Sequence, residues 1–167
     1  NDTIMKKILL TLSFVLVTMY ASAAFKVGNL YYQPDYQADD GTCWVCESPY
    51  NGGYDGLTDI TIPGRVTYNG TEYRVTAIGN DAFKNVTTLQ QVRLGWGVEE
   101  ISPYAFAGCT GLKYVYLPST LKNIYNYAFQ GCSSMTQMGV AASTPPTLSS
   151  YALSGMKVCD IFTAIQT

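Results

Sequence analysis

The chain has 167 residues, which is enough for one domain with a small additional segment, and its formal net charge is −2. Charged residues make up only 13% of the sequence and form no basic cluster, which argues against nucleic acids and acidic membrane surfaces as partners. Because histidine is absent, imidazole-dependent triads and general bases are excluded, together with most zinc sites.

Residues 1–23 are organised like an export signal. Four residues precede Met5, a basic pair follows it, residues 8–17 are apolar, and residues 21–23 (ASA) form a small-x-small cleavage site. The apolar run is too short and wrongly flanked for a membrane anchor. We therefore expect cleavage after Ala23, a secreted, cell-surface or periplasmic location, and no transmembrane segment in the mature chain.

Residues 24–77 predict an N-terminal cap made of β-hairpins. Two segments, 25–32 and 66–75, place β-branched or aromatic residues on both sides of a two-residue turn. The second turn is Asn69-Gly70, a pair that accepts the positive φ angles of a type I′ turn. A solenoid end needs such a cap because it would otherwise expose core and a strand edge.

Residues 78–146 contain three copies of one 23-residue unit, and a partial copy follows from Leu148. Each unit has a short alternating strand pattern and too many apolar positions for a single amphipathic helix, which favours a coil whose turns stack on one another. Residues 60–63 (ITIP) resemble residues 115–118 (VYLP), so a degenerate first strand is expected inside the cap segment. Three of the apolar columns are Ile78, Ile101, Ile124 and Leu148; Phe83, Phe106, Phe129 and Leu153; and Val86, Cys109, Cys132 and Met156.

The pattern A-F-x-x-C-x-x-L-x-x-V-x-L-P-x-x-L-x-x-I, which residues 104–124 match at every hallmark position, resembles the BspA-type leucine-rich repeat of bacterial surface proteins. The first copy departs from it at Val86 and at Gly95-Trp96-Gly97. The resemblance implies a leucine-rich-repeat solenoid with short parallel strands, about 3.5 to 4 repeats over residues 78–167, rich in β-structure with little helix. It also implies a secreted or surface-attached binding protein with no catalytic residues and no cofactor.

Cys43-x-x-Cys46 is the one motif with catalytic potential. A redox site would need the first cysteine at a helix start, and a zinc site would need a second pair, and the sequence offers neither pattern. The favoured alternatives are a local disulfide or two thiols in a solvated cap loop. For Cys109 and Cys132, which the period stacks one turn apart, we favour a buried apolar ladder over a disulfide between turns.

The residues between the buried columns of each strand are the candidate binding residues. Tyrosine and arginine combine contact area with polar groups and are enriched at binding hot spots, but ordinary cross-strand packing explains them equally well. We expect a non-catalytic, exported binding or adhesion module that recognises a protein or a glycan through this face. A structural spacer within a longer surface protein is the alternative, and a thiol oxidoreductase using Cys43 and Cys46 is a remote one. The candidate binding residues are Gln91, Arg93, Tyr114, Tyr116 and Gln137.

Overall fold

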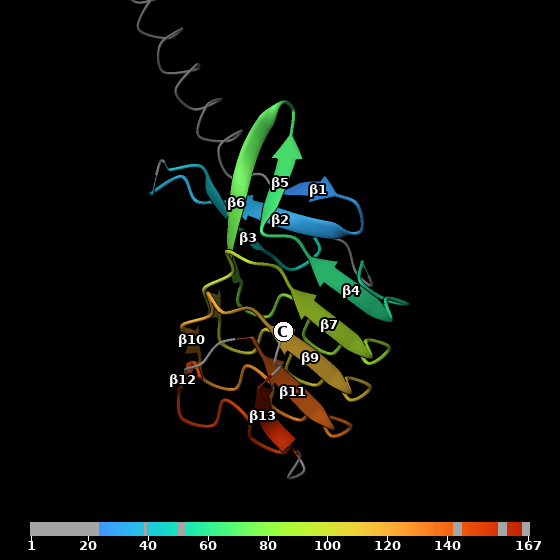
Figure 1. Cartoon of the computed structure of the whole chain (residues 1–167). Helices are drawn as coiled ribbons and strands as arrows, with labels where there is room; N and C mark the ends of the chain where they lie inside the picture. Colours follow the sequence, from blue (N-terminus) through green and yellow to red (C-terminus); the bar gives the residue numbers. More distant parts are fainter. Residues whose placement is uncertain (1–23, 39, 50–52, 142–144, 157–159, 165–167) are drawn as a thin grey trace, which may run out of the picture.

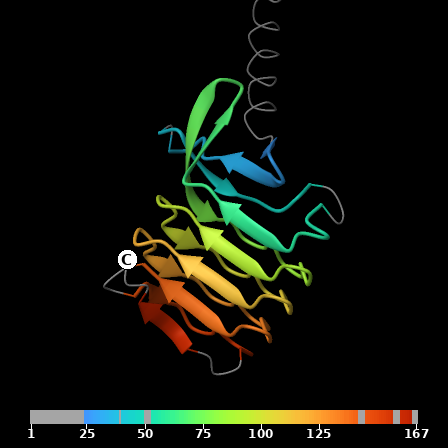
Figure 2. The same ribbon diagram turned by 45° about the vertical axis from the view of Figure 1, so that its right-hand side comes forward.

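The computed structural model describes residues 24–38, 40–49, 53–141, 145–156 and 160–164. The predicted signal peptide at 1–23 therefore lies outside the described residues. In the described part the chain winds through successive turns of a solenoid, and it contains strands and turns but no helix. The strands stack like the rungs of a ladder in two sheets (Figures 1 and 2).

The first sheet, called here the repeat sheet, is built from the L-x-x-V-x-L strands and is parallel throughout. Gln91 pairs with Tyr114 and Tyr114 with Gln137, which is the 23-residue step predicted from the sequence. Asp59 pairs with Gln91, a step of 32, because a hairpin is inserted into the first turn. The strands, in spatial order, are β4 (Asp59–Ile62), β7 (Gln91–Leu94), β9 (Tyr114–Leu117), β11 (Gln137–Val140) and β13 (Asp160–Ala164).

The second sheet, called here the cap sheet, joins the predicted cap to the repeats. Its cap strands are β1 (Phe25–Val27), β2 (Leu30–Pro34) and β3 (Thr42–Val45), and β3 pairs in parallel with β6 (Thr71–Ile78). The sheet continues through one two-residue strand per repeat, and β5 pairs with β6 beside this path. The remaining members are β5 (Arg65–Tyr68), β8 (Glu100–Ile101), β10 (Asn123–Ile124) and β12 (Thr147–Leu148).

Both predicted hairpins are confirmed. β1 and β2 are antiparallel around Gly28, and β5 and β6 are antiparallel around Asn69-Gly70. Asn69 and Gly70 have φ angles of 49° and 80°, as the type I′ turn requires. The Phe25 ring packs on Tyr68 of the second hairpin with ring centroids 4.5 Å apart, so aromatic contacts tie the two hairpins together.

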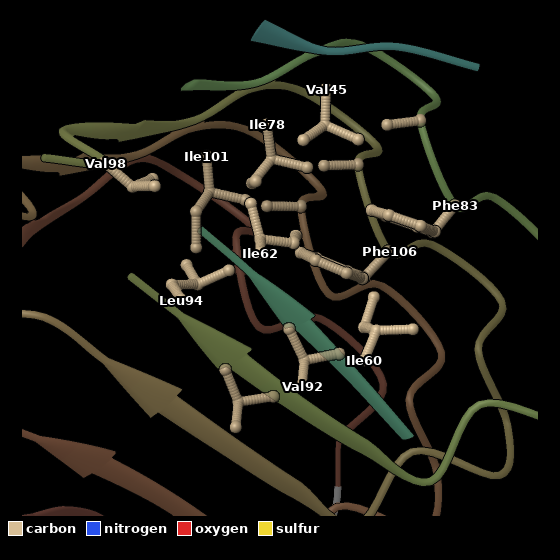
Figure 3. Close-up of a cluster of buried hydrophobic side chains, with 14 of the residues drawn as sticks. Val45, Ile60, Ile62, Ile78, Phe83, Val92, Leu94, Val98, Ile101 and Phe106 are labelled. Carbon is tan, nitrogen blue, oxygen red and sulfur yellow. The ribbon is translucent and has the colours of Figure 1, made fainter. Parts of the chain in front are cut away.

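The core lies between the two sheets. Figure 3 shows side chains of β4 and β7, such as Ile62 and Val92, pointing toward Ile78 and Ile101 of the cap sheet. The three phenylalanines of the repeats stack in parallel, with centroids 5.2 Å apart at both steps and all three rings fully buried. These are Phe83, Phe106 and Phe129.

Tyr54 extends this ring column into the cap, which the sequence period did not reveal. Its ring lies 4.8 Å from that of Phe83 and is buried, while its hydroxyl group accepts a hydrogen bond from the Tyr31 N–H and donates one to the Cys46 carbonyl. A phenol therefore ends the column, because its ring packs on the repeats and its oxygen bonds to cap backbone. Repeat packing thus begins within the segment predicted as cap, as does strand β4.

The partial fourth copy differs from the predicted columns. Leu148 is 40% exposed, although Ile78, Ile101 and Ile124 in the same column are fully buried. The A-F segments are turns held to the next repeat by backbone hydrogen bonds, such as that from Phe106 N–H to the Ala128 carbonyl. Inter-repeat bonds therefore continue outside the sheets and satisfy polar backbone that a solenoid must bury.

We expect Phe106→Ala to lower the free energy of unfolding by about 3–5 kcal/mol, because Phe106 is packed between two rings and its loss leaves a cavity. The control is Trp96→Ala at an exposed turn, which should change stability by no more than about 0.5 kcal/mol. Urea unfolding of the two variants measures both values. Equal effects would contradict the ring column as the centre of the core.

Candidate functional site

The five predicted binding residues lie on the outer face of the repeat sheet, called here the repeat face. The strand register places Gln91, Tyr114 and Gln137 in one column and Arg93 beside Tyr116 in the next. The alternate residues of these strands, such as Val92 and Val115, are buried. Strand periodicity therefore directs the five side chains away from the core, in two adjacent columns with a rung spacing of about 4.8 Å.

Arg93 and Tyr116 form a pair that fixes the centre of this face. The guanidinium carbon of Arg93 lies 4.4 Å from the centroid of the Tyr116 ring, within the range of a cation–π interaction. Arg93 is exposed, and its guanidinium forms no hydrogen bond or ion pair with any other residue in the described part of the chain. The stack therefore orients the planar group while leaving its N–H donors available to a ligand.

Tyr114 supplies the main aromatic surface of the repeat face. Its side chain is 39% exposed and lies between two glutamines in the register, whereas Tyr116 is half-buried. On the other side of Tyr116 the register places Gly139, which has no side chain. The face therefore combines a cation, two phenols and amide groups, a set that suits carboxylates, sugar hydroxyls and apolar protein surface.

A second tyrosine column was missed by the sequence analysis. Tyr104, Tyr127 and Tyr151 stack with ring centroids 5.0 and 5.5 Å apart and interplanar angles of 14° and 5°. All three have φ near +60°, the left-handed region that bulky residues rarely adopt. Asp81 holds the same backbone position in the first repeat, and Lys84 bridges it to the column by pairing with its carboxylate at 2.7 Å and lying over the Tyr104 ring.

The signal for this column was present in the sequence. Tyr104 and Tyr127, 23 residues apart, each precede an alanine-phenylalanine pair, and Tyr151 precedes the corresponding alanine-leucine pair of the partial copy. This signal went unused because that position belongs to no buried column. Stacking of the rings offsets some of the backbone strain, since aromatic pairs contribute about 0.5–1.5 kcal/mol each. Tyr104 and Tyr127 are half-buried in the stack, whereas Tyr151, which has a ring on one side only, is 65% exposed.

This strain is testable with a matched pair of variants. Tyr127→Gly and Tyr127→Ala remove the same ring and differ only by the Cβ methyl group, which restricts the backbone of alanine. At φ +59° we expect the glycine variant to be more stable by about 1 kcal/mol, the reverse of the usual order, because only glycine adopts this conformation without cost. Thermal unfolding measures the difference, and an alanine variant of equal or greater stability would contradict the assigned backbone.

Trp96 is the most exposed of the large apolar side chains in the described residues, at 72%. It stands in the turn after β7, where the neighbouring positions along the solenoid are Gly64 and Ser119. Gly64 has no room for a side chain, since a Cβ there would lie 1.7 Å from the Trp96 carbonyl oxygen. The indole therefore has no large neighbour on either side, and it lies outside the repeat face because it follows the strand.

The cysteine motif differs from the prediction of a solvated cap loop. Cys43 lies in β3 and is fully buried, while Cys46 is half-buried, and both thiols are free. Burial raises the pKa of Cys43 to about 12, with a smaller contribution from Cys46, and burial raises the pKa of Cys46 to about 11. Protonated thiols are poor nucleophiles, so this environment opposes thiol redox chemistry.

Cys109 and Cys132 are also free and buried, in agreement with the predicted ladder. Each thiol approaches a phenylalanine carbonyl oxygen in the preceding repeat. The sulfur atoms lie 3.0 Å from the oxygen of Phe83 and 3.2 Å from that of Phe106. The cysteine position therefore adds a weak S–H donor to an otherwise apolar column.

We expect Cys46 to be the first of these four thiols to react with iodoacetamide in the native protein. Its pKa of about 11 against an ordinary 9.0 lowers the thiolate fraction at pH 8 by about 100-fold, and the rate should rise about tenfold per pH unit up to pH 11. Mass spectrometry of the labelled peptides reads each site. Rapid labelling of Cys43 at pH 8 would contradict its burial.

Within residues 24–38, 40–49, 53–141, 145–156 and 160–164, no group of three histidine, cysteine or acidic residues is arranged to hold a metal ion. The same residues contain no helix long and apolar enough to cross a membrane.

The geometry defines the class of the protein, a leucine-rich-repeat solenoid. The model of the BspA-type leucine-rich repeat region matches residues 54–164 with six copies, and the chain belongs to this family. The match begins at Tyr54, so it includes the β4 turn and counts more copies than the sequence period suggested. A search of curated proteins gave no match.

Solved structures show the same fold. A leucine-rich repeat protein from Bacteroides capillosus has a TM-score of 0.71 and 26% identity, with 87% of this chain and all of that chain covered. One from Bacteroides ovatus has a TM-score of 0.65 and 24% identity over 82% of this chain, but this chain spans only 33% of its length. The T. pallidum leucine-rich repeat protein has a TM-score of 0.58 and 18% identity, covering 85% of this chain and 64% of its own.

Proposed function

We propose that this protein is a non-catalytic, exported binding module that recognises an acidic protein or glycan through the repeat face. The observation that carries the proposal is the Arg93–Tyr116 stack beside the exposed ring of Tyr114. The stack holds a cation in place with its donors unpaired, and a guanidinium fork matches a carboxylate with two parallel hydrogen bonds. Because the residues stand on strands rather than loops, less side-chain and backbone entropy is lost on binding.

The chemistry of the face favours a ligand that combines a carboxylate with an apolar surface. Such a ligand could be an acidic sugar, whose ring face packs on tyrosine, or a protein segment that carries aspartate or glutamate. The proposal of export is supported by the basic, apolar and small-residue order of residues 1–23, and membership of the BspA-type family is consistent with it. Purification of the mature chain from the native host and N-terminal sequencing tests that part separately.

A structural spacer is the second candidate, since this chain corresponds to only a third of the length of the B. ovatus protein. In that case the repeats would act as a rigid spacer between other parts of the protein, and the repeat face would bind no ligand. The two proposals differ in whether substitutions on the face alter binding while the fold is unchanged.

We expect Tyr114→Ala combined with Tyr116→Ala to weaken binding to immobilised matrix proteins or acidic glycans by at least about tenfold, the loss typical of a hot-spot pair. Arg93→Lys should lose affinity as well, because lysine keeps the charge but not the planar fork. Trp96→Ala is the matched control, since it removes an exposed aromatic residue outside the face. Unchanged binding by the folded double variant would favour the spacer.

A further inference from the structure

In the part of the chain that the structure describes, the cap covers the end of only one of the two sheets. In the cap sheet, the first repeat strand pairs with β3, and the sheet continues through β2 to β1. In the repeat sheet the order ends at β4, whose only strand partner among the described residues is β7. Figures 1 and 2 show β4 as the first strand of the repeat stack, with the cap strands belonging to the other sheet. An unpaired edge of this kind is a template for another strand.

The hydrogen bonds of β4 show which backbone groups face the open edge. The carbonyl oxygens of Thr58 and Ile62 accept bonds from β7, at 3.1 Å from Gln91 N and 2.7 Å from Gly95 N. In a parallel ladder, alternate residues point to the same neighbour, so Ile60 also bonds toward β7. Asp59 and Thr61 point the opposite way, and their N–H and C=O groups bond to no other residue in the described part of the chain.

Pro63 fits this assignment. It follows Thr61 by two residues, so its backbone nitrogen also faces the open edge. Because no described strand pairs there, the N–H that proline lacks is not needed for a hydrogen bond, and a proline is tolerated at such an edge. The open edge thus presents four backbone groups, the N–H and C=O of Asp59 and of Thr61. It ends at Pro63, which has no N–H to donate.

A groove runs along this edge. It has a volume of about 240 Å³, and its opposite wall is the β1–β2 hairpin, including Asn29 of the turn and Leu30 of β2. Leu57, which is half-buried, adds apolar surface to its lining. Asp59 is the only charged residue among the described residues that line it, so the groove favours a cationic or neutral ligand over an acidic one.

We propose that the groove beside β4 is a docking site for an extended polypeptide segment of a partner protein, which adds to the repeat sheet as a further strand. Main-chain amides in an extended conformation repeat donors and acceptors at the two-residue interval that Asp59 and Thr61 present. An apolar side chain of the segment would enter the groove near Leu57, and a lysine or arginine would pair with Asp59. A glycan does not repeat amide donors and acceptors at this interval.

This site adjoins the repeat face, because the register places Asp59 beside Gln91 and Thr61 beside Arg93, but it binds in a different way. Its contacts are main-chain groups at the end of the sheet, whereas the proposed ligand of Arg93 and Tyr114 is acidic and contacts side chains. The two sites therefore prefer ligands of opposite charge, and variants at one should leave binding at the other intact.

The probe is a phage library of random heptapeptides, panned against the folded chain, with recovered sequences resynthesised for fluorescence anisotropy. We expect apolar peptides with a basic residue whose affinity falls at least about tenfold on Thr61→Pro, which removes an edge donor. Thr61→Val is the matched control, because it keeps the N–H and a β-branched side chain. The double variant Tyr114→Ala, Tyr116→Ala should bind these peptides as the original chain does.

Two further measurements do not depend on the proline variant folding. Two versions of the best peptide are made, one N-methylated at its odd-numbered residues and the other at its even-numbered residues. The version whose methyl groups replace the N–H groups that face β4 should lose binding, and the other version should keep it. In the free protein, amide hydrogen exchange should be fast at Asp59 and Thr61 and at least about 100-fold slower at Ile60 and Ile62. Failure to recover peptides, equal binding to Thr61→Pro, indifference to N-methylation, or strong protection of the Asp59 and Thr61 amides would each overturn the proposal.

Discussion

The fold depends on contacts between side chains of successive turns. No single turn can bury its own apolar residues, so each phenylalanine relies on the ring one repeat away, at 5.2 Å in both steps of the column. The same repetition aligns the strands, the turn hydrogen bonds and the cysteine column. Because this core extends in one direction, its ends are the vulnerable places, and Tyr54 ends the ring column by bonding its hydroxyl group to cap backbone.

Rigid repetition also determines what the surface can do. Side chains that alternate with the core residues are brought to a fixed spacing, which turns isolated arginine and tyrosine residues into the Arg93–Tyr116 stack. The tyrosine column at Tyr104, Tyr127 and Tyr151 shows a cost of the same rule, since it repeats a strained backbone in each of three turns. Function can therefore be placed on such a scaffold by changing surface positions while the buried columns stay the same.

The two proposed sites use different properties of one sheet. The repeat face presents side chains, so its specificity resides in residue identity, and the β4 edge presents backbone, so its specificity resides in conformation. The cysteines fit neither role. Cys43, Cys109 and Cys132 are fully buried, and burial raises their pKa values, so they act as small apolar residues of the core.

The sequence by itself determined the repeat, its buried columns, both hairpins and the outward direction of Gln91, Arg93, Tyr114, Tyr116 and Gln137. These follow from periodicity and turn chemistry, which are local properties written into residue spacing. The tertiary structure decided the contacts between segments that share no period. It brought Tyr54 onto Phe83, buried Cys43 within β3, and paired the cap with only one sheet. Such contacts depend on how the inserted hairpin shifts the first turn from 23 to 32 residues, and spacing alone does not encode where the chain returns.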